Sequence, residues 1–468
     1  MKTRIETDSL GPVNVAVDAL WGAQTQRSLH YFRIGSRLGN SQQFPRAFIY
    51  AFARVKKAAA LANHELEKLP GTFCHLITQA CDEIIAGQHD DQFPLVIWQT
   101  GSGTQTNMNL NEVIANRANE LAGKKRGDKS PIHPNDHVNL SQSSNDVFPT
   151  VMHIATAQAI EQELLPALDY LQHVLTEKSQ VFSRSIKSGR THMMDATPIT
   201  LGQEFSGYQS QVSYAHKQIA ATLASVQTLA IGGSAVGTGI NTPPRWTETV
   251  TKHISNETGI SFSSADNKFM AMAGHEALTD LQGRLRLLAS VLFKIGSDLR
   301  LMASGPRCGL AEIYLPENEP GSSIMPGKIN PTQIEALTMV AIQVMGNDAA
   351  VGFANSLGQF ELNAYKPLIF RNVYESIILL SGAVNGFTTH CVKGLRANEE
   401  KLAWYVEKSL MLATALTPVI GYDKAAQAAK LAHENNLSLK QAVVQLGYMS
   451  AALFDSTVKA QTDSLLVS

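Results

Sequence analysis

The clearest pattern in the chain is an apolar seam between residues 278 and 302. Apolar side chains recur there at alternating steps of three and four residues, at Leu278, Leu281, Leu285, Leu288, Leu292, Ile295, Leu299 and Met302. This spacing predicts a long helix that packs at a shallow angle in a bundle. A less regular version of the same rhythm runs from Tyr208 to Val226. Bundle core, within one chain or between subunits, explains the seam better than a zipper for a foreign partner, and helices of this length favour oligomers.

Proline placement divides the chain into three regions and predicts a mainly α fold. Residues 1–143 are punctuated by prolines, whereas the middle region holds long stretches in which helices can run unbroken. Residues from 397 onward read as short helical patterns with a break at Gly421. We therefore expect three domains, an N-terminal domain (1–143), a central helical bundle (144–396) and a small C-terminal helical domain (397–468). The proline-free stretches are 199–242, 245–305, 332–366 and 368–417.

Composition and charge exclude several classes of function. The 468 residues carry 39 Lys and Arg against 40 Asp and Glu, which gives a formal net charge of −1. This balance argues against a nucleic-acid partner and against a basic membrane-binding face. No run of about 18 uninterrupted apolar residues exists, so we expect no span of a bilayer.

The cysteines and the N-terminus bear on the compartment. Four scattered cysteines form no zinc or iron–sulfur spacing, so we expect no metal and reduced thiols. The N-terminus has early acidic residues and no apolar stretch typical of a signal peptide. We therefore expect a soluble cytoplasmic protein. The cysteines are Cys74, Cys81, Cys308 and Cys391.

Two polar turns precede apolar-periodic segments in the first part of the chain. The turn at 100–109 places Gly101 and Gly103 before a predicted helix, where backbone N–H groups can face an anion. It is not a dinucleotide fingerprint, because the third glycine would fall at Thr106, and on its pattern alone it reads as a capped loop. In the turn at 141–146, Asp146 or Asn145 is expected to cap the next helix, which leaves several hydroxyl and amide side chains without a structural role.

Two further polar turns follow. His192 lies in the turn at 189–195, ahead of a helix expected near Thr200; a lone histidine is usually structural, but its neighbour Thr191 and the helix entry suggest more. The turn at 321–331 nearly imitates a phosphate-binding loop, but five residues separate its glycines and Ile329 replaces the required Ser or Thr. Its tandem serines and Lys328 suit a smaller anion such as a carboxylate. The residues alone thus indicate an anion-binding enzyme in a helical bundle, with neither metal nor nucleotide.

These segments also carry a resemblance. From about Arg4 to about residue 455 the chain resembles the aspartase/fumarase superfamily and, within it, the class II fumarases. His192 and Gly327 favour fumarase, because aspartases typically have Gln and Ala there. The segments are G-S-G-T-Q-T-N-M-N at 101–109, H-P-N-D at 133–136, S-Q-S-S-N-D at 141–146, G-R-T-H at 189–192 and G-S-S-I-M-P-G-K-I-N at 321–330.

The resemblance implies reversible hydration of fumarate to L-malate without a cofactor. It implies that Ser322 is the base that takes the carbon proton, and that His192, with Glu335 setting its charge, holds or protonates the leaving hydroxide through a bound water. Lys328 and Asn330 would grip the carboxylate whose dianion forms. The other implied substrate contacts are Ser102, Thr104, Ser143, Ser144, Asn145, Thr191 and Ser323.

The resemblance also implies a second, non-catalytic carboxylate site at His133, Asn135 and Asp136. By composition alone these residues form a simple turn. Ser130 stands where many relatives have Arg, so a bidentate grip is lost and we expect a weak second site. Thr106 for the usual Ser and Val419 for a common His are the other departures.

The family fold implies a homotetramer of three-domain, mostly helical chains, in which three subunits contribute to each active site. The substrate is then a small dicarboxylate. Two other functions stay open at this point. Aspartate ammonia-lyase shares the carboxylate-binding loop, and a non-catalytic helical oligomer could keep the fold, although a scaffold has no physical need for Ser322, Lys328, Asn330 and His192 together.

Overall fold

The computed structural model describes residues 2–466, which divide into two compact units. Because each unit joins segments far apart in the sequence, the domain boundaries near residues 143 and 396 stay a prediction. Unit 1 comprises Met1–Leu165, Gln218–Arg286 and Gln343–Leu379, and unit 2 comprises Pro166–Lys217, Leu287–Ile342 and Leu380–Ser468.

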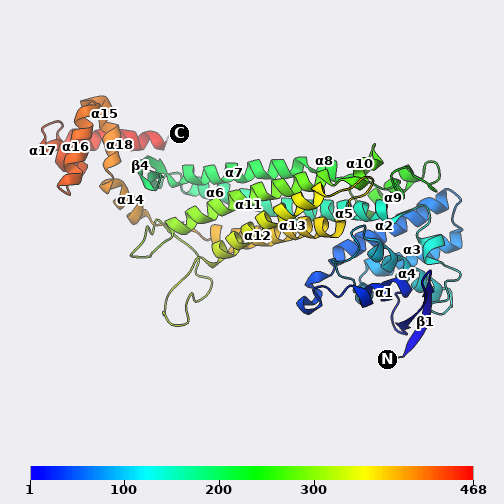
Figure 1. The fold of residues 1–468 in the computed structure, drawn as a ribbon. Coiled ribbons are helices and arrows are strands. Elements are labelled where there is room, and N and C mark those ends of the chain that lie inside the picture. The colour runs from blue at the N-terminus through cyan, green and yellow to red at the C-terminus, as the bar shows by residue number, and fades with distance from the viewer. Residues whose placement is uncertain (1, 467–468) are drawn as a thin grey trace. The chain divides into compact units, whose positions relative to one another are not determined.

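Unit 1 begins with a strand hairpin, and most of its other elements are helices (Figure 1). Its core contains an aromatic cluster in which the Phe48 ring lies 5.2 Å from that of Phe148 and 4.4 Å from that of Phe370, between ring centroids. The cluster supports the segment that carries the polar turns at 100–109 and 141–146. The elements up to residue 164 are β1 (Thr3–Asp8), β2 (Gly11–Ala16), α1 (Ala23–Tyr31), η1 (Ser36–Gln42), α2 (Arg46–Glu65), α3 (Gly71–Ile85), η2 (Asp90–Gln92), α4 (Thr104–Leu121), η3 (Pro134–Val138), α5 (Ser144–Ala159) and η4 (Ile160–Leu164).

Long helices dominate the middle of the chain, as the proline-free stretches predict. All eight residues of the apolar seam lie in α11 and are at most 4% exposed, so its prediction as bundle core is confirmed. The mainly α fold class is confirmed as well. The elements are α6 (Leu165–Val181), β3 (Ile186–Thr191), β4 (Met194–Thr200), α7 (Leu201–Ala221), α8 (Leu223–Val226), β5 (Thr228–Leu229), α9 (Trp246–Thr258), β6 (Ser263–Ser264), α10 (Lys268–Ala273), α11 (Glu276–Met302), β7 (Ile313–Tyr314), α12 (Thr332–Ser356), α13 (Lys366–Phe387), η5 (Thr388–Val392) and β8 (Arg396–Ala397).

Helix α12 differs from α11 in leaving apolar side chains uncovered. Met339 is 65% exposed, Ile342 is 59% exposed and Phe353 is 75% exposed. By length and composition alone α12 could cross a membrane, and 28% of its most apolar stretch of 18 residues is buried. An exposed apolar face of this kind usually marks a surface that another molecule covers.

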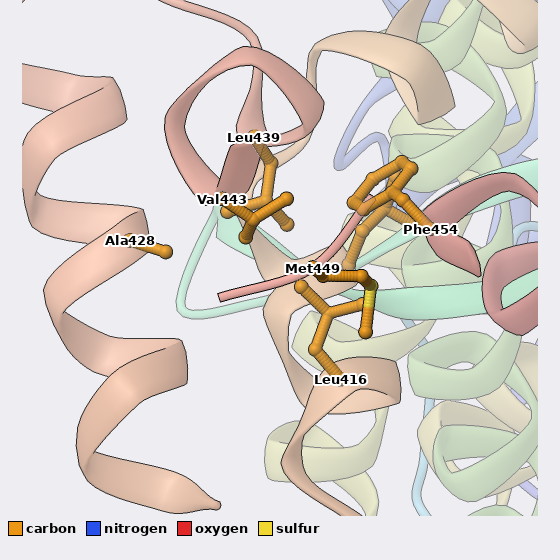
Figure 2. Packing of buried hydrophobic residues seen from close by; sticks show 7 residues of the cluster. Leu416, Ala428, Leu439, Val443, Met449 and Phe454 are labelled. Atoms are coloured by element: carbon orange, nitrogen blue, oxygen red, sulfur yellow. The ribbon is translucent and has the colours of Figure 1, made fainter. Parts of the chain in front are cut away.

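The C-terminal helices of unit 2 have a small core of their own. Helices α15–α18 lie around one another (Figure 1), and Gly421, with a φ of +82°, separates α15 from α16. Figure 2 shows Leu416, Val443 and Met449 among the side chains that meet in this core, with Phe454 beside them. The elements are α14 (Glu399–Lys408), η6 (Leu410–Leu412), α15 (Ala413–Ile420), α16 (Tyr422–Glu434), α17 (Leu439–Gln445) and α18 (Ala451–Leu465).

We expect Leu416→Ala to loosen this core selectively. Leu416 is fully buried, and removing a buried leucine side chain costs about 2–5 kcal/mol of local stability. Amide hydrogen exchange should therefore quicken in α15–α18 and change little in α11. Val419→Ala is the control, because Val419 in the same helix is 51% exposed. Unchanged exchange in α15–α18 would show that the cluster contributes no stability.

Candidate active site

A chain of three hydroxyl groups joins the first two polar turns in unit 1. Thr104, the first residue of α4, has its Oγ1 2.9 Å from Ser102 Oγ and 2.7 Å from Ser144 Oγ. Ser144 is the first residue of α5, forty positions along the chain. All three side chains are half-buried. The structure therefore brings together three of the predicted substrate contacts at the starts of two helices, where backbone dipoles favour an anion.

Close packing explains both glycines of the first turn. A Cβ on Gly101 would lie 1.3 Å from the carbonyl oxygen of Ala364, and one on Gly103 would lie 2.1 Å from the Phe148 ring. Gly103 also has a φ of +78°, a conformation that favours glycine. Thr106, which replaces the usual Ser, is buried and donates a hydrogen bond to Gln99 Oε1 (2.9 Å). The turn thus depends on packing, and Thr106 has a structural role in it.

A buried carboxylate holds the second turn. The prediction that Asp146 or Asn145 caps α5 is wrong, because Ser143 is the N-cap and Asp146 completes a capping box with it. Asp146 Oδ1 accepts a hydrogen bond from the Ser143 N–H (3.0 Å), and its Oδ2 accepts from the N–H groups of Gly232 (3.0 Å) and Ser234 (2.9 Å). This carboxylate therefore fixes the second turn against the segment at 232–235.

The segment at 232–235 also orients a predicted substrate contact. Asn145 Nδ2 donates a hydrogen bond to the carbonyl oxygen of Ala235 (2.8 Å), and this bond fixes the orientation of the side-chain amide. Sequence reasoning missed this segment. In the sequence, this segment is marked only by a run of small residues around Gly232 and Gly233, and such a run has no periodic pattern that would predict its position.

Burial shifts the pKa of two groups beneath the second turn. Burial raises the pKa of Asp146 to about 6, and the three backbone N–H bonds oppose that rise. Burial lowers the pKa of Lys56 to about 7, and its Nζ donates to Asn139 Oδ1 (3.1 Å) and Gln142 Oε1 (3.0 Å). The sequence pattern predicts Asp146 only as a cap and does not single out Lys56. Both bind residues of the turn, so they support it from the buried side.

The signature loop in unit 2 is closed by its own backbone. The Gly321 N–H donates to the Lys328 carbonyl oxygen (2.7 Å), and Asn330 Nδ2 donates to the Gly321 carbonyl oxygen (2.6 Å). Inside the loop, Ser322 Oγ accepts hydrogen bonds from the N–H groups of Ile324 (3.3 Å) and Met325 (3.1 Å). The side chains of Ser323 and Lys328 are exposed. Ser323 and Lys328 therefore face outward from a closed loop that ends where α12 begins, whereas Ser322 Oγ is bonded within the loop.

Thr191 and His192 lie at the tip of a β-hairpin, not at the helix entry that the sequence suggested. Strands β3 and β4 pair antiparallel, with Thr191 opposite Met194, and α7 begins only after β4 ends. His192 and Met193 form the turn with φ values of 56° and 61°, and the Thr191 and His192 side chains are exposed. A two-residue turn with positive φ at both positions is typical of hairpins.

Glu335 lies in the first turn of α12, five residues after Asn330. Its carboxylate is 3.6 Å from the Arg300 guanidinium at the end of α11, and both side chains are well exposed. Such a pair contributes little to stability. The Glu335 carboxylate is therefore accessible from outside unit 2.

The predicted second carboxylate site borders a cavity of about 360 Å³ in unit 1. His133 and Asn135 line it, whereas Asp136 does not. His133 Nδ1 accepts hydrogen bonds from the N–H groups of Asn135 and Asp136, both at 3.2 Å. Lys129 also lines the cavity and donates to the Thr7 carbonyl oxygen. The acidic lining residues are Glu6, Asp8 and Glu112, of which Glu6 pairs with Arg4 (2.7 Å) and Asp8 with Arg27 (2.8 Å). With two carboxylates already paired and the third lining the cavity together with Lys129, little positive charge remains to bind an anion.

The chemistry of these groups is hydrogen bonding to an anion and proton transfer. Hydroxyls, amides, an ammonium and an imidazole are present, and within residues 2–466 no group of three or more His, Cys, Asp or Glu side chains is placed to hold a metal ion. The predicted substrate contacts lie partly in unit 1 and partly in unit 2, each set on turns or helix starts.

Two family profiles match the chain. The profile described as "Lyase" matches residues 11–346, and the profile described as "Fumarase C C-terminus" matches residues 412–462.

Curated relatives and solved structures agree with the profiles. The chain is 59% identical to the class II fumarate hydratase of Thermosynechococcus vestitus over 98% of this chain and 97% of that one, and 56% identical to that of Pseudomonas syringae pv. tomato over the same shares. A class II fumarase from Schistosoma mansoni has a TM-score of 0.95 and 44% identity, covering 98% of both chains. A fumarate lyase:delta crystallin from Brucella melitensis, bound to cobalt, has a TM-score of 0.93 and 41% identity over 98% of both chains.

We expect Gly101→Ala to lower the free energy of unfolding by about 1–3 kcal/mol, because the added methyl group overlaps the Ala364 carbonyl oxygen and pushes the turn away from it. Chemical denaturation measures the change. Gly207→Ala is the control, since a Cβ there meets no neighbour within 4 Å and alanine is favoured inside a helix. Equal stability of the two variants would show that the turn does not need the close approach of Gly101 to Ala364.

Proposed function

The chain belongs to the class II fumarate hydratases, which hydrate fumarate to L-malate in the tricarboxylic acid cycle, and from this premise we propose which residues carry the reaction. The observation that favours this assignment most is the hydroxyl chain of Ser102, Thr104 and Ser144, which presents donors to a small dicarboxylate at two helix starts.

Ser322 is the proposed base that takes the proton from the carbon beside a carboxylate of L-malate. A serine needs its alkoxide form stabilised for this role. The N–H groups of Ile324 and Met325 already donate to Ser322 Oγ, and Lys328 adds a positive charge in the same loop. These donors would stabilise the negative charge of the Ser322 alkoxide and so lower the free energy needed to form it.

Removal of that proton forms a carbanion whose charge spreads into the neighbouring carboxylate. Lys328 and Asn330 are the proposed grip on this dianion, since preorganised donors and a cation often supply the largest catalytic effect. Thr104, Ser143, Ser144 and Asn145 hold the rest of the substrate, with Ser102 and Ser323 as further contacts. Water then leaves from the face opposite the proton, an anti elimination.

His192, beside Thr191, is proposed to hold or protonate the leaving hydroxide through a bound water. Its exposed place at a hairpin tip lets it reach a site outside its own unit. Glu335 is proposed to set the charge of His192, and its carboxylate is exposed. Three elements would thus combine in one active site.

The active form is proposed to be a homotetramer in which several subunits share each active site. Several candidate side chains are exposed, among them His192, Ser323 and Lys328. The apolar face of α12 around Met339, Ile342 and Phe353 needs a cover. Helices of other copies are a better cover than lipid, because the match of the lyase profile extends into α12 as far as residue 346. The second carboxylate site at His133, Asn135 and Asp136 is proposed to be weak, given its carboxylate-lined cavity.

We also propose a domain partition of the chain and a cellular compartment for the protein. The partition is 1–143, 144–396 and 397–468, and the separate core of α15–α18 together with the family match at 412–462 supports the last boundary. The cytoplasm is the proposed location, which the four free cysteines support. The site residues need neither a metal nor an organic cofactor for this chemistry.

We expect Ser322→Ala to lower kcat by at least about a hundredfold with a KM change under about threefold, because the base acts on the transition state more than on substrate binding. The measurement is the ultraviolet absorbance of fumarate formed from L-malate. Ser456→Ala, at an exposed serine of α18, is the control. Near-normal turnover by the variant would refute the role of Ser322, and ammonia release from L-aspartate by the unaltered protein would point to an ammonia-lyase.

Sharing of active sites between subunits predicts complementation. Ser322→Ala and Ser144→Ala chains, co-expressed with two different affinity tags and purified through both, should form mixed tetramers at least about tenfold more active than either variant alone. Mass measurement by light scattering should give about four times the chain's 50.7 kDa. Each variant paired with a tagged copy of itself is the control. Mixed oligomers as inactive as the controls would mean that one chain supplies both serines to a site.

A further inference from the structure

The hairpin that carries His192 has no buried side chain at its tip. Residues 191–195 are all exposed, and the turn itself has positive φ at His192 and Met193. A cavity of about 490 Å³ lies beside it, lined by Lys187, Arg190 and His192 among others. Packing therefore leaves open space next to the hairpin, and its orientation depends on the residues at its base.

A buried carboxylate binds the base of this hairpin. Glu312 is 0% exposed, and its Oε1 accepts a hydrogen bond from Arg190 Nη1 (2.7 Å), two residues before His192. Its Oε2 lies 3.4 Å from Lys187 Nζ, on the same strand. One carboxylate thus holds two cations of β3 that would otherwise repel each other in a buried place.

The ion pairs continue from β3 into two bundle helices. Lys187 Nζ donates to Glu204 Oε2 on α7 (2.5 Å), and Tyr208 OH lies 2.7 Å from Glu204 Oε1 and 3.1 Å from Asp298 Oδ2 on α11. Lys294 Nζ pairs with Asp298 at 2.5 Å. The network is buried at Lys187 and Glu312 and becomes partly exposed at Lys294 and Asp298. Strand β3 is therefore joined to α7 and α11 through charges.

Glu312 itself is fixed by its backbone. Its N–H donates to the Met302 carbonyl oxygen at the end of α11 (2.8 Å), and its carbonyl oxygen accepts from the Asn398 N–H (2.9 Å). Glu312 precedes Ser322 by ten residues on the segment that leads to the signature loop. The same residue is thus anchored to the bundle and bonded to the His192 hairpin.

Arg190 is poorly placed to bind substrate directly. Its guanidinium donates to Glu312 and lies 5.4 Å from the centre of the Tyr405 ring, and its side chain is 15% exposed. The Glu312 carboxylate and the Tyr405 ring hold this guanidinium on two sides inside the unit, so it can transmit position to the hairpin.

We propose that Glu312 is a positioning residue for His192, acting through Arg190. The proposal rests on the role of His192 given above and adds a residue outside the motifs that carry the chemistry. Without the carboxylate, Arg190 and Lys187 lose their common partner, and the hairpin turns away from the orientation that the leaving hydroxide needs. A displacement of about 1 Å in a catalytic group can cost about a hundredfold in rate.

A double-mutant cycle tests the coupling. The variants are Glu312→Gln, His192→Asn and the two together, with kcat and KM measured from L-malate. Glu312→Gln should lower kcat by about tenfold to a hundredfold with KM within about threefold. In the His192→Asn background the same change should alter kcat by less than about twofold, because the residue it positions is gone.

The controls separate the outcomes. Arg396→Gln removes a guanidinium that lies 5.4 Å from the Tyr314 ring, away from β3, and should leave kcat unchanged in both backgrounds. An equal loss from Glu312→Gln in both backgrounds would overturn positioning through His192. Near-normal kcat in His192→Asn alone would overturn the role of His192, and with it the premise.

A second variant covers the case in which Glu312→Gln fails to fold. Arg190→Gln breaks the link from Glu312 to the hairpin but leaves Glu312 neutralised by Lys187. It should reproduce the same pattern, a kcat loss that disappears in the His192→Asn background, with circular dichroism and oligomer mass unchanged. Arg190→Gln that folds and keeps normal kcat would refute the proposal.

Discussion

The carboxylate of Asp146 accepts hydrogen bonds from three backbone N–H groups that belong to two segments almost ninety residues apart. This interaction decides where the second polar turn lies, and therefore where Ser144 meets Thr104 and where Asn145 meets Ala235. Burying a charge is costly unless such bonds compensate it, and the pKa of Asp146, raised to about 6, records the part of the cost that remains. Packing against Phe148 and Ala364 holds the first turn, whereas the buried charge of Asp146 holds the second.

Buried carboxylates hold two further segments in the same way, whereas the signature loop is closed by its own backbone. Glu312 does for the His192 hairpin what Asp146 does for the serine turn. Glu112, a buried residue of α4, accepts from the N–H groups of Gly22, Gln24 and Thr25 and so fixes the start of α1. The long helices supply a rigid frame, the buried carboxylates join the turns to it, and the exposed side chains at the turns are left to act on the substrate.

Sequence reasoning reached the elements that have a local signature. The α11 seam was predictable because its period is local, and the starts of α4 and α12 were predictable from the glycines and proline before them. It misplaced His192 beside a helix entry because β3 and β4 pair across a two-residue turn without the usual Asn-Gly or Asp-Gly signal. It missed Glu312 and Lys56 because a single buried charge has no period, and its partners lie far away in the sequence. The chemical character of the turns could be predicted from the sequence, whereas the buried groups that hold the turns in place could not.

The central claim is that turns from different subunits converge on one dicarboxylate, and that the buried carboxylates of Asp146 and Glu312 hold two of these turns. A crystal structure of the assembled enzyme with bound L-malate tests it most directly. The account predicts one malate whose carboxylates and hydroxyl lie within about 3.2 Å of Ser144, of Lys328 and of the His192 water, with these residues belonging to different chains. A malate bound by residues of one chain alone, or remote from Ser322, would contradict it.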